Sequence, residues 1–146
     1  ARIIELMGGQ GEGVASAARE IYSDWAEHQH FEIYADVSET LRAIHGRGVR
    51  LGLISNSHRC LDSFGPHFDL DGLFSVTVSS AEFGVMKPDP AIFHLCCDRF
   101  GLAPGDFLFV DDSPTNIAAA QALGFDTHHF TNPAALAPAL ERRGLL

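Results

Sequence analysis

The chain has 146 residues, of which 46% are hydrophobic, 10% aromatic and 20% charged, and its formal net charge is −9. This composition argues against disorder, and the length favours one domain with a real core. The negative charge repels nucleic-acid backbones and anionic membranes, so we expect neither as a partner. No apolar stretch approaches the ~20 residues of a membrane helix. No secretion signal is recognised at the start, so we expect a cytoplasmic protein.

The first 35 residues differ from the rest. A short apolar run at residues 3–7 precedes a glycine-rich stretch at 8–13 and a helical stretch at 14–25. The glycines do not have the first, third and sixth positions of a dinucleotide-binding fingerprint. We therefore predict a hinge followed by a helix, and treat residues 1–35 as a separate N-terminal helical segment.

From residue 36 onward, helix and strand patterns alternate. Helices are predicted over residues 36–46, 89–100, 113–123 and 133–143, and strands over 49–54, 73–78, 106–110 and 125–130. Asp36 and Glu39 have the spacing of a capping box, and Asp89 and Ser113 each precede a proline, which is a helix-start signal. The alternation with nearly continuous apolar strands predicts an α/β fold over residues 36–146, with a parallel sheet flanked by helices.

Polar residues follow the predicted strands, at the edge where α/β sheets carry their functional groups. The hydroxyl of Ser55 and the backbone N–H of Asn56 could bind a phosphate oxygen, although such a pair is also common in ordinary turns. Lys87 lies in a Lys-Pro-Asp-Pro run before a helix. It could neutralise a phosphate or a carboxylate, or it could be a solvated loop lysine.

Asp111 and Asp112 are adjacent at the end of a buried strand, where two carboxylates repel each other. A hard divalent cation relieves this repulsion and prefers oxygen ligands. Successive side chains of an extended chain point to opposite sides, so only one of the two is expected to bind the ion directly. The alternative is that both aspartates merely cap the following helix.

Together these motifs resemble the haloacid dehalogenase superfamily of hydrolases. Residues 53–56 (LISN) are similar to its second motif, 80–93 (SAEFGVMKPDPAIF) to its third and 107–116 (FLFVDDSPTN) to its fourth, in the family's order. The resemblance implies a Rossmann-like sheet and, in most members, phosphatase activity. It also implies that Ser55 and Asn56 bind the phosphoryl group and that Lys87 stabilises its charge. Asp112 would bind magnesium directly and Asp111 would support it.

The family's first motif, an Asp-x-Asp pair that carries the nucleophile, has no counterpart ahead of Ser55. We therefore expect a truncated member that lacks the central strand between those bearing Ser55 and Asp111, with residues 1–35 as a remnant of the family's helical cap. Residues 68–71 (FDLD) are similar to the missing motif. They follow Gly-Pro and lie between the second and third motifs, so we predict a loop there.

Three functions remain open without that nucleophile. The favoured one is a hydrolase in which metal-activated water attacks phosphodiesters, phosphotriesters or phosphomonoesters. Mg²⁺ is the expected cofactor, with Mn²⁺ or Zn²⁺ as alternatives. The others are a catalytically inactive module that binds phosphate or a partner, and one piece of a split phosphatase. His58 is a further candidate as ligand or base, and the pair His128 and His129 is another.

Removal of a central strand leaves two backbone edges uncovered. The flanking strands could pair directly, residues 3–7 could fill the slot, or a second chain could supply an element. We expect a homodimer or larger assembly, for which the N-terminal helical segment offers an apolar surface with Ile21, Tyr22, Trp25 and Phe31.

Overall fold

The computed structural model describes residues 13–25, 32–34, 36–57, 61 and 64–146. The chain divides into two compact units, Ala1–Glu32 and Ile33–Leu146. The first contains helix α2 (Gly13–Trp25), on which Ile21 is 59% exposed. Among the described residues, no helix is both long and apolar enough to cross a membrane.

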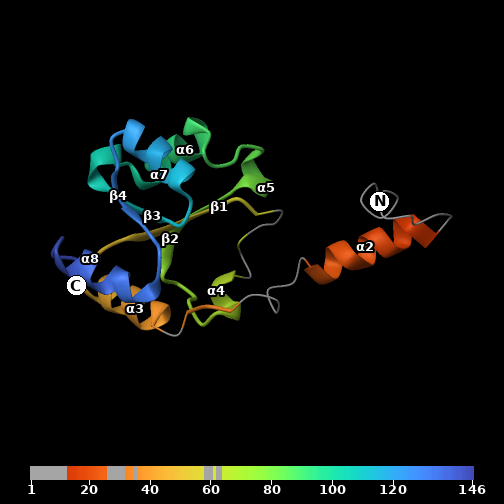
Figure 1. Cartoon of the computed structure of the whole chain (residues 1–146), viewed down its shortest axis with the longest axis horizontal. Helices are drawn as coiled ribbons and strands as arrows, with labels where there is room; N and C mark the ends of the chain where they lie inside the picture. Colours follow the sequence, from red (N-terminus) through yellow and green to blue (C-terminus); the bar gives the residue numbers. More distant parts are fainter. Residues whose placement is uncertain (1–12, 26–31, 35, 58–60, 62–63) are drawn as a thin grey trace. The chain divides into compact units, whose positions relative to one another are not determined.

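The second unit alternates helices and strands (Figure 1). In chain order its elements are α3 (Val37–Gly46), β1 (Leu51–Ser55), α4 (Phe64–His67), β2 (Phe74–Ser79), α5 (Ser80–Phe83), α6 (Pro90–Phe100), the 3-10 helix η2 (Pro104–Asp106), β3 (Leu108–Asp111), α7 (Pro114–Ala122), β4 (Asp126–His129), the 3-10 helix η3 (Pro133–Ala135) and α8 (Leu136–Glu141). The strands and helices α3, α6 and α7 begin and end within two residues of their predicted positions, whereas the helix predicted over residues 133–143 forms as η3 followed by the shorter α8. The predicted α/β class with parallel strands flanked by helices is therefore confirmed.

The four strands form two parallel pairs. Strand β1 pairs with β2, which places Ser55 opposite Ser79, and β3 pairs with β4, which places Asp111 opposite His129. Within the described residues no ladder joins β1 to β3, so the direct pairing considered above does not form. This arrangement agrees with the predicted gap in the sheet. Residues 3–7, the other segment of this chain considered for the place of the missing strand, lie outside the described ranges.

Helices cover the strands on two sides. In Figure 1, α6 and α7 lie on one side of the strands, and α3 and α8 lie on the other. The main core lies under α6 and α7, where the fully buried ring of Phe93 packs edge-on against Phe109 at 5.2 Å and Phe125 at 5.8 Å between centroids. On β3, Phe109 and Asp111 are buried while Val110 between them is 37% exposed, as expected for alternating side chains.

Two of the predicted helix starts form as expected. The side chain of Asp89 accepts a hydrogen bond from the N–H of Ala91 at the start of α6, and Ser113 caps α7 in the same way. The capping box predicted at Asp36 is wrong. That residue has helical backbone angles (φ −89°, ψ −10°), and its side chain makes no capping bond, because this geometry turns the carboxylate away from the first-turn N–H groups.

Two short helices, α4 and α5, were not predicted. The start of α5 carried a signal, because Ser79 and Glu82 have capping-box spacing, and the Ser79 hydroxyl does accept a bond from a first-turn N–H. The FDLD segment forms a turn after α4, as predicted. Its Leu70 is buried, whereas Asp69 has a φ of 54° and binds Arg42 through an exposed carboxylate.

Candidate functional site

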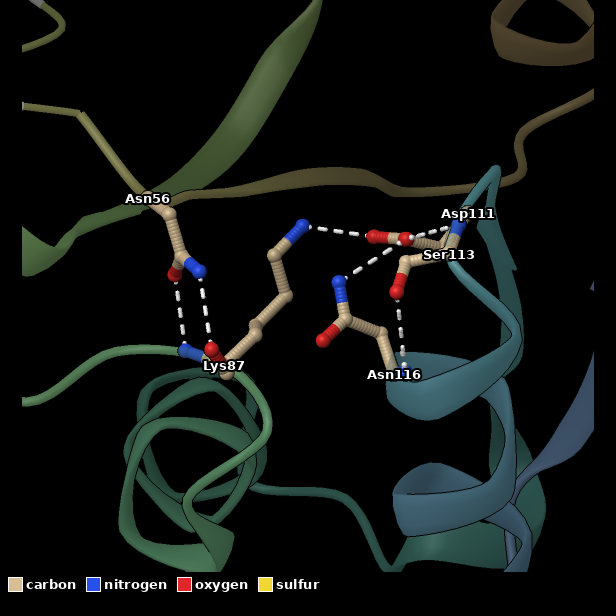
Figure 2. Close-up of polar contacts among 5 residues, drawn as sticks. All are labelled: Asn56, Lys87, Asp111, Ser113 and Asn116. Atoms are coloured by element: carbon tan, nitrogen blue, oxygen red, sulfur yellow. Dashed lines mark hydrogen bonds and ion pairs between the residues drawn. The ribbon is translucent and has the colours of Figure 1, made fainter.

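The site lies at the carboxyl ends of β1 and β3, and a loop before α6 brings Lys87 between them (Figure 2). The Lys87 Nζ lies 2.6 Å from Asp111 Oδ2. Both side chains are nearly buried, with exposed fractions of 12% for Lys87 and 6% for Asp111. Lys87 is also the only lysine in the sequence. The only lysine ammonium of the sequence is therefore paired with this carboxylate, in an environment where a charge needs a partner.

Asp111 is held on its other oxygen as well. Its Oδ1 accepts hydrogen bonds from the N–H of Ser113 and from Asn116 Nδ2, both at 2.9 Å. Burial alone would raise the pKa of Asp111. The bonds from Lys87, Ser113 and Asn116 outweigh that effect and hold the pKa below its usual value. Asp111 is therefore an ionised, fully engaged carboxylate.

Asn56 approaches Lys87 from the end of β1. Its Nδ2 donates to the Lys87 carbonyl oxygen at 2.8 Å, and its Oδ1 accepts from the Lys87 N–H at 2.7 Å (Figure 2). The sequence motif predicts a role for the backbone of Asn56 and gives no indication of this use of its carboxamide. A side chain that follows a strand gives no signal in the sequence of which loop it will meet.

The two other predicted site residues do not join this network. Ser55 is half-buried, and its hydroxyl makes no hydrogen bond among the described residues. Asp112 is exposed, and its carboxylate makes no hydrogen bond within the described part of the chain, whereas its backbone carbonyl oxygen lies 3.0 Å from His129 Nε2. The structure thus connects Asn56, Lys87 and Asp111, and leaves the Ser55 hydroxyl and the Asp112 carboxylate available for other ligands.

Of the two adjacent aspartates, one has a carboxylate that could bind a hard cation directly. Both oxygens of Asp111 are already occupied, whereas the adjacent carboxylate of Asp112 is exposed. Magnesium commonly binds through one or two carboxylates and keeps several waters. No cluster of three or more His, Cys, Asp or Glu suited to a metal occurs within the ranges that the structure describes. A site built on Asp112 would therefore draw further oxygen ligands from substrate and water.

The candidate histidines fall in different places. His58 lies outside the described residues. His128 has a buried Nε2 without a hydrogen-bond partner in the described part of the chain, and burial, with nearby Arg143 and Arg142, lowers its pKa. The His129 ring lies with its Nε2 3.0 Å from the Asp112 carbonyl oxygen. Among the described residues, neither imidazole is hydrogen-bonded to the side chain of Lys87 or Asp111, although the backbone of His129 pairs with that of Asp111 in the β3–β4 ladder.

The fold and these strand-end residues define a class, that of parallel α/β proteins with a polar site at the carboxyl ends of their strands. Comparison with known proteins names the family. A model of the haloacid dehalogenase-like hydrolase family matches residues 4–124. The chain belongs to this family.

Its relatives include phosphatases and dehalogenases. A phosphoglycolate phosphatase of Mannheimia succiniciproducens is 36% identical over 93 residues, which are 63% of this chain and 42% of that protein. An (S)-2-haloacid dehalogenase 4A of Burkholderia cepacia is 28% identical over 101 residues, 68% of this chain and 44% of that protein. The chain thus spans less than half the length of these curated relatives.

A solved structure covers more of the chain. A hydrolase from Streptococcus pneumoniae TIGR4 matches with a TM-score of 0.70 and 25% identity, over 94% of this chain and 72% of that one. This agreement supports the Rossmann-like α/β fold described above.

Proposed function

We propose that this chain is a metal-dependent phosphoester hydrolase of haloacid dehalogenase type. The observation that carries the proposal is the buried Lys87–Asp111 pair at 2.6 Å, which holds one ammonium group at the meeting point of two strand ends. Such a fixed cation, in a chain of net charge −9, is where a phosphoryl group would find compensating charge. The named phosphatase among the relatives supports this substrate class.

Each site residue has a role in the proposal. Lys87 faces the phosphoryl oxygens, Ser55 donates its hydroxyl to one of them, and the N–H of Asn56 donates to another. Asp112 holds the cation directly, while Asp111 fixes Lys87 and orients the cation's surroundings. When bound, Mg²⁺, or Mn²⁺ or Zn²⁺ in its place, supplies positive charge that offsets the phosphoryl oxygens and makes water more acidic.

Water is the proposed nucleophile. Residues 1–54 contain no Asp-x-Asp pair, and the carboxylates of the FDLD turn are exposed, with Asp69 bound to Arg42. Water attack requires no phospho-aspartyl intermediate. The site would then accept phosphodiesters and phosphotriesters besides small phosphomonoesters.

Turnover of three aryl esters tests the proposal. Purified chain is assayed with p-nitrophenyl phosphate, bis(p-nitrophenyl) phosphate and an aryl phosphotriester, each with and without EDTA. We expect EDTA and Asp112→Ala to abolish turnover. The control Asp98→Ala, which removes an exposed carboxylate of α6, leaves turnover unchanged. Equal rates for Asp112→Ala and the unaltered chain would reject the assigned site, and a trappable aspartyl phosphate would reject water as nucleophile.

A second candidate rests on the separation of the two strand pairs. Within the described residues, the edges of β1 and β3 are unpaired with each other, and Val110 on β3 is 37% exposed. An added strand would cover such edges. In this alternative the chain is one piece of a split phosphatase, or a phosphate- or partner-binding module. If the purified chain has no turnover by itself and a complementing chain restores turnover, the split phosphatase is favoured.

We also propose a homodimer that works in the cytoplasm. The exposed Ile21 of α2 and the strand edges support self-association, and the buried free thiols of Cys96 and Cys97 agree with a reducing compartment. Light scattering after size exclusion tests the assembly. A monomer at micromolar concentration would rule out the dimer.

A further inference from the structure

Asn56 makes a two-point contact with the backbone of Lys87. Its carboxamide donates from Nδ2 to the Lys87 carbonyl oxygen at 2.8 Å and accepts at Oδ1 from the Lys87 N–H at 2.7 Å. Both the N–H and the carbonyl of a single residue are thereby satisfied by one side chain (Figure 2). The contact joins the end of β1 to the loop before α6, 31 residues further along the chain.

The contact needs a side chain with a donor and an acceptor at the same end. A carboxamide of this length provides both. An ionised aspartate provides two acceptors and would face the Lys87 carbonyl oxygen with a second negative oxygen. Alanine and serine would not span both groups. Few other side chains at position 56 could therefore form both hydrogen bonds to the Lys87 backbone.

Both sides of the contact are themselves anchored. On the β1 side, the hydroxyls of Ser57 and Ser79 lie 2.9 Å apart, and Ser80 Oγ donates to the Ser57 carbonyl oxygen at 2.9 Å. On the loop side, the N–H of Asp89 donates to the Met86 carbonyl oxygen at 2.8 Å. Asn56 thus connects two segments that are each held by further hydrogen bonds.

The effect on Lys87 follows from the length of its side chain. Four rotatable bonds separate the Lys87 backbone from Nζ, so the ammonium reaches Asp111 at 2.6 Å only if the backbone starts from the right place. Asn56 fixes that starting place. The ring of Phe109, with its centroid 5.7 Å from Nζ, then borders the path of the side chain.

We propose that the Asn56 carboxamide is a positioning residue that places the Lys87 ammonium at the phosphoryl site. The role rests on the proposed function, in which Lys87 faces the phosphoryl group. It assigns to the side chain of Asn56 a task separate from phosphate binding by its backbone N–H.

The single lysine gives a direct test that does not depend on turnover. Chain grown with ¹³Cε,¹⁵Nζ-lysine has one labelled ammonium, that of Lys87. In the unaltered chain we expect a dispersed ammonium signal that exchanges slowly, because the group is buried and ion-paired. In Asn56→Ala we expect the signal to move to the position of free lysine or to vanish by exchange. Asn132→Ala, which removes a carboxamide bonded to the Ala135 N–H, is the matched control and should leave the signal unchanged.

Asn56→Asp gives a second test, in which the lysine signal depends on pH only if the carboxamide contact positions Lys87. A protonated aspartate donates from one oxygen and accepts at the other, so it reproduces both bonds, whereas the ionised form does not. The lysine signal of Asn56→Asp should therefore resemble that of Asn56→Ala at pH 8, and it should approach that of the unaltered chain at the same pH as the pH falls through about 4, where an exposed aspartate takes up a proton. Circular dichroism of each variant checks that the fold is retained.

Turnover completes the experiment. With bis(p-nitrophenyl) phosphate, we expect Asn56→Ala to lower kcat about 10- to 100-fold, with a smaller change in KM, because a misplaced charge acts mainly on the transition state. An unchanged lysine signal in folded Asn56→Ala would overturn the inference even if the chain is active. If the lysine signal is displaced in Asn56→Ala but the unaltered chain has no turnover, the positioning of Lys87 by Asn56 is upheld and the proposed function is refuted instead.

Discussion

The Lys87–Asp111 pair makes a sharp prediction about stability. Lys87→Met retains an unbranched apolar stem of similar length and removes the ammonium. Asp111, whose side chain is 6% exposed, would then keep only the bonds from the Ser113 N–H and Asn116 Nδ2. The variant therefore leaves a buried carboxylate with its hydrogen bonds on one oxygen and none on the other.

The magnitude follows from burial. Removal of one partner from a buried ion pair costs about 3–5 kcal/mol. The two remaining bonds to Asp111 Oδ1 put the expectation at the lower end, about 3 kcal/mol of the free energy of unfolding. For a chain of this size, that loss lowers the melting temperature by about 6–12 °C. Arg42→Met is the matched control, because its partner Asp69 is 97% exposed and such pairs contribute about 0–1 kcal/mol.

The loss should depend on pH. In the unaltered chain, the pKa of Asp111 lies below its usual value, so its ionisation stabilises the fold above that usual value. This contribution disappears as the pH falls through the lowered pKa. In Lys87→Met the largest lowering contact is gone, and the buried carboxyl takes up a proton at higher pH. The difference between the two proteins should therefore be largest at pH 7 and shrink toward pH 4.

Urea denaturation followed by circular dichroism at pH 7 and pH 4.5 measures both effects. Asp111→Asn and the double variant complete a cycle, and we expect the double variant to lose less than the sum of the single losses. A loss below about 1 kcal/mol that is equal at the two pH values would refute the reasoning, since it would mean that water solvates the pair.

Three further predictions concern other residues. Asp112→Ala should weaken Mn²⁺ binding in calorimetry by at least tenfold yet change stability by less than about 0.5 kcal/mol, because the side chain is exposed; unaltered affinity would exclude it as a ligand. Gly52→Ala would place its Cβ 2.6 Å from Phe100 Cε2, so urea denaturation should report a loss of about 1–3 kcal/mol, whereas Gly46→Ala, with open space around its Cβ, should cause none. Burial raises the pKa of Cys96 to about 11, so native protein should not react there with Ellman's reagent at pH 8, and rapid labelling would contradict its burial.

The sequence predicted the secondary structure well wherever local chemistry decides it. Asp89 and Ser113, each before a proline, marked the starts of α6 and α7 because their side chains satisfy first-turn N–H groups without help from distant residues. The same reasoning failed at Asp36, since a capping motif also requires non-helical backbone angles at its first residue. Those angles depend on how the preceding chain enters the helix.

The sequence indicated which residues lie near the candidate site but not which of them are bonded to one another. Strand ends and loop position brought Lys87 and the two aspartates to one edge, but which carboxylate Lys87 would bind depends on side-chain direction. Asp111 shares the buried side of β3 with Phe109, and Lys87 reaches that side. The contact between Asn56 and Lys87 likewise depends on how two distant segments meet, for which no local pattern exists.

The division of the described strands into two parallel pairs bears on the order in which the chain folds. The pair β1 and β2 closes within residues 51–79, and the pair β3 and β4 closes within residues 108–129. Pairing of segments close in sequence costs less loop entropy and forms faster than distant pairing. Helix α6 lies between the pairs along the chain and contributes Phe93 to the core. Each pair can thus nucleate by itself, with α6 joining them, so the amides of α6 should open last in native-state hydrogen exchange.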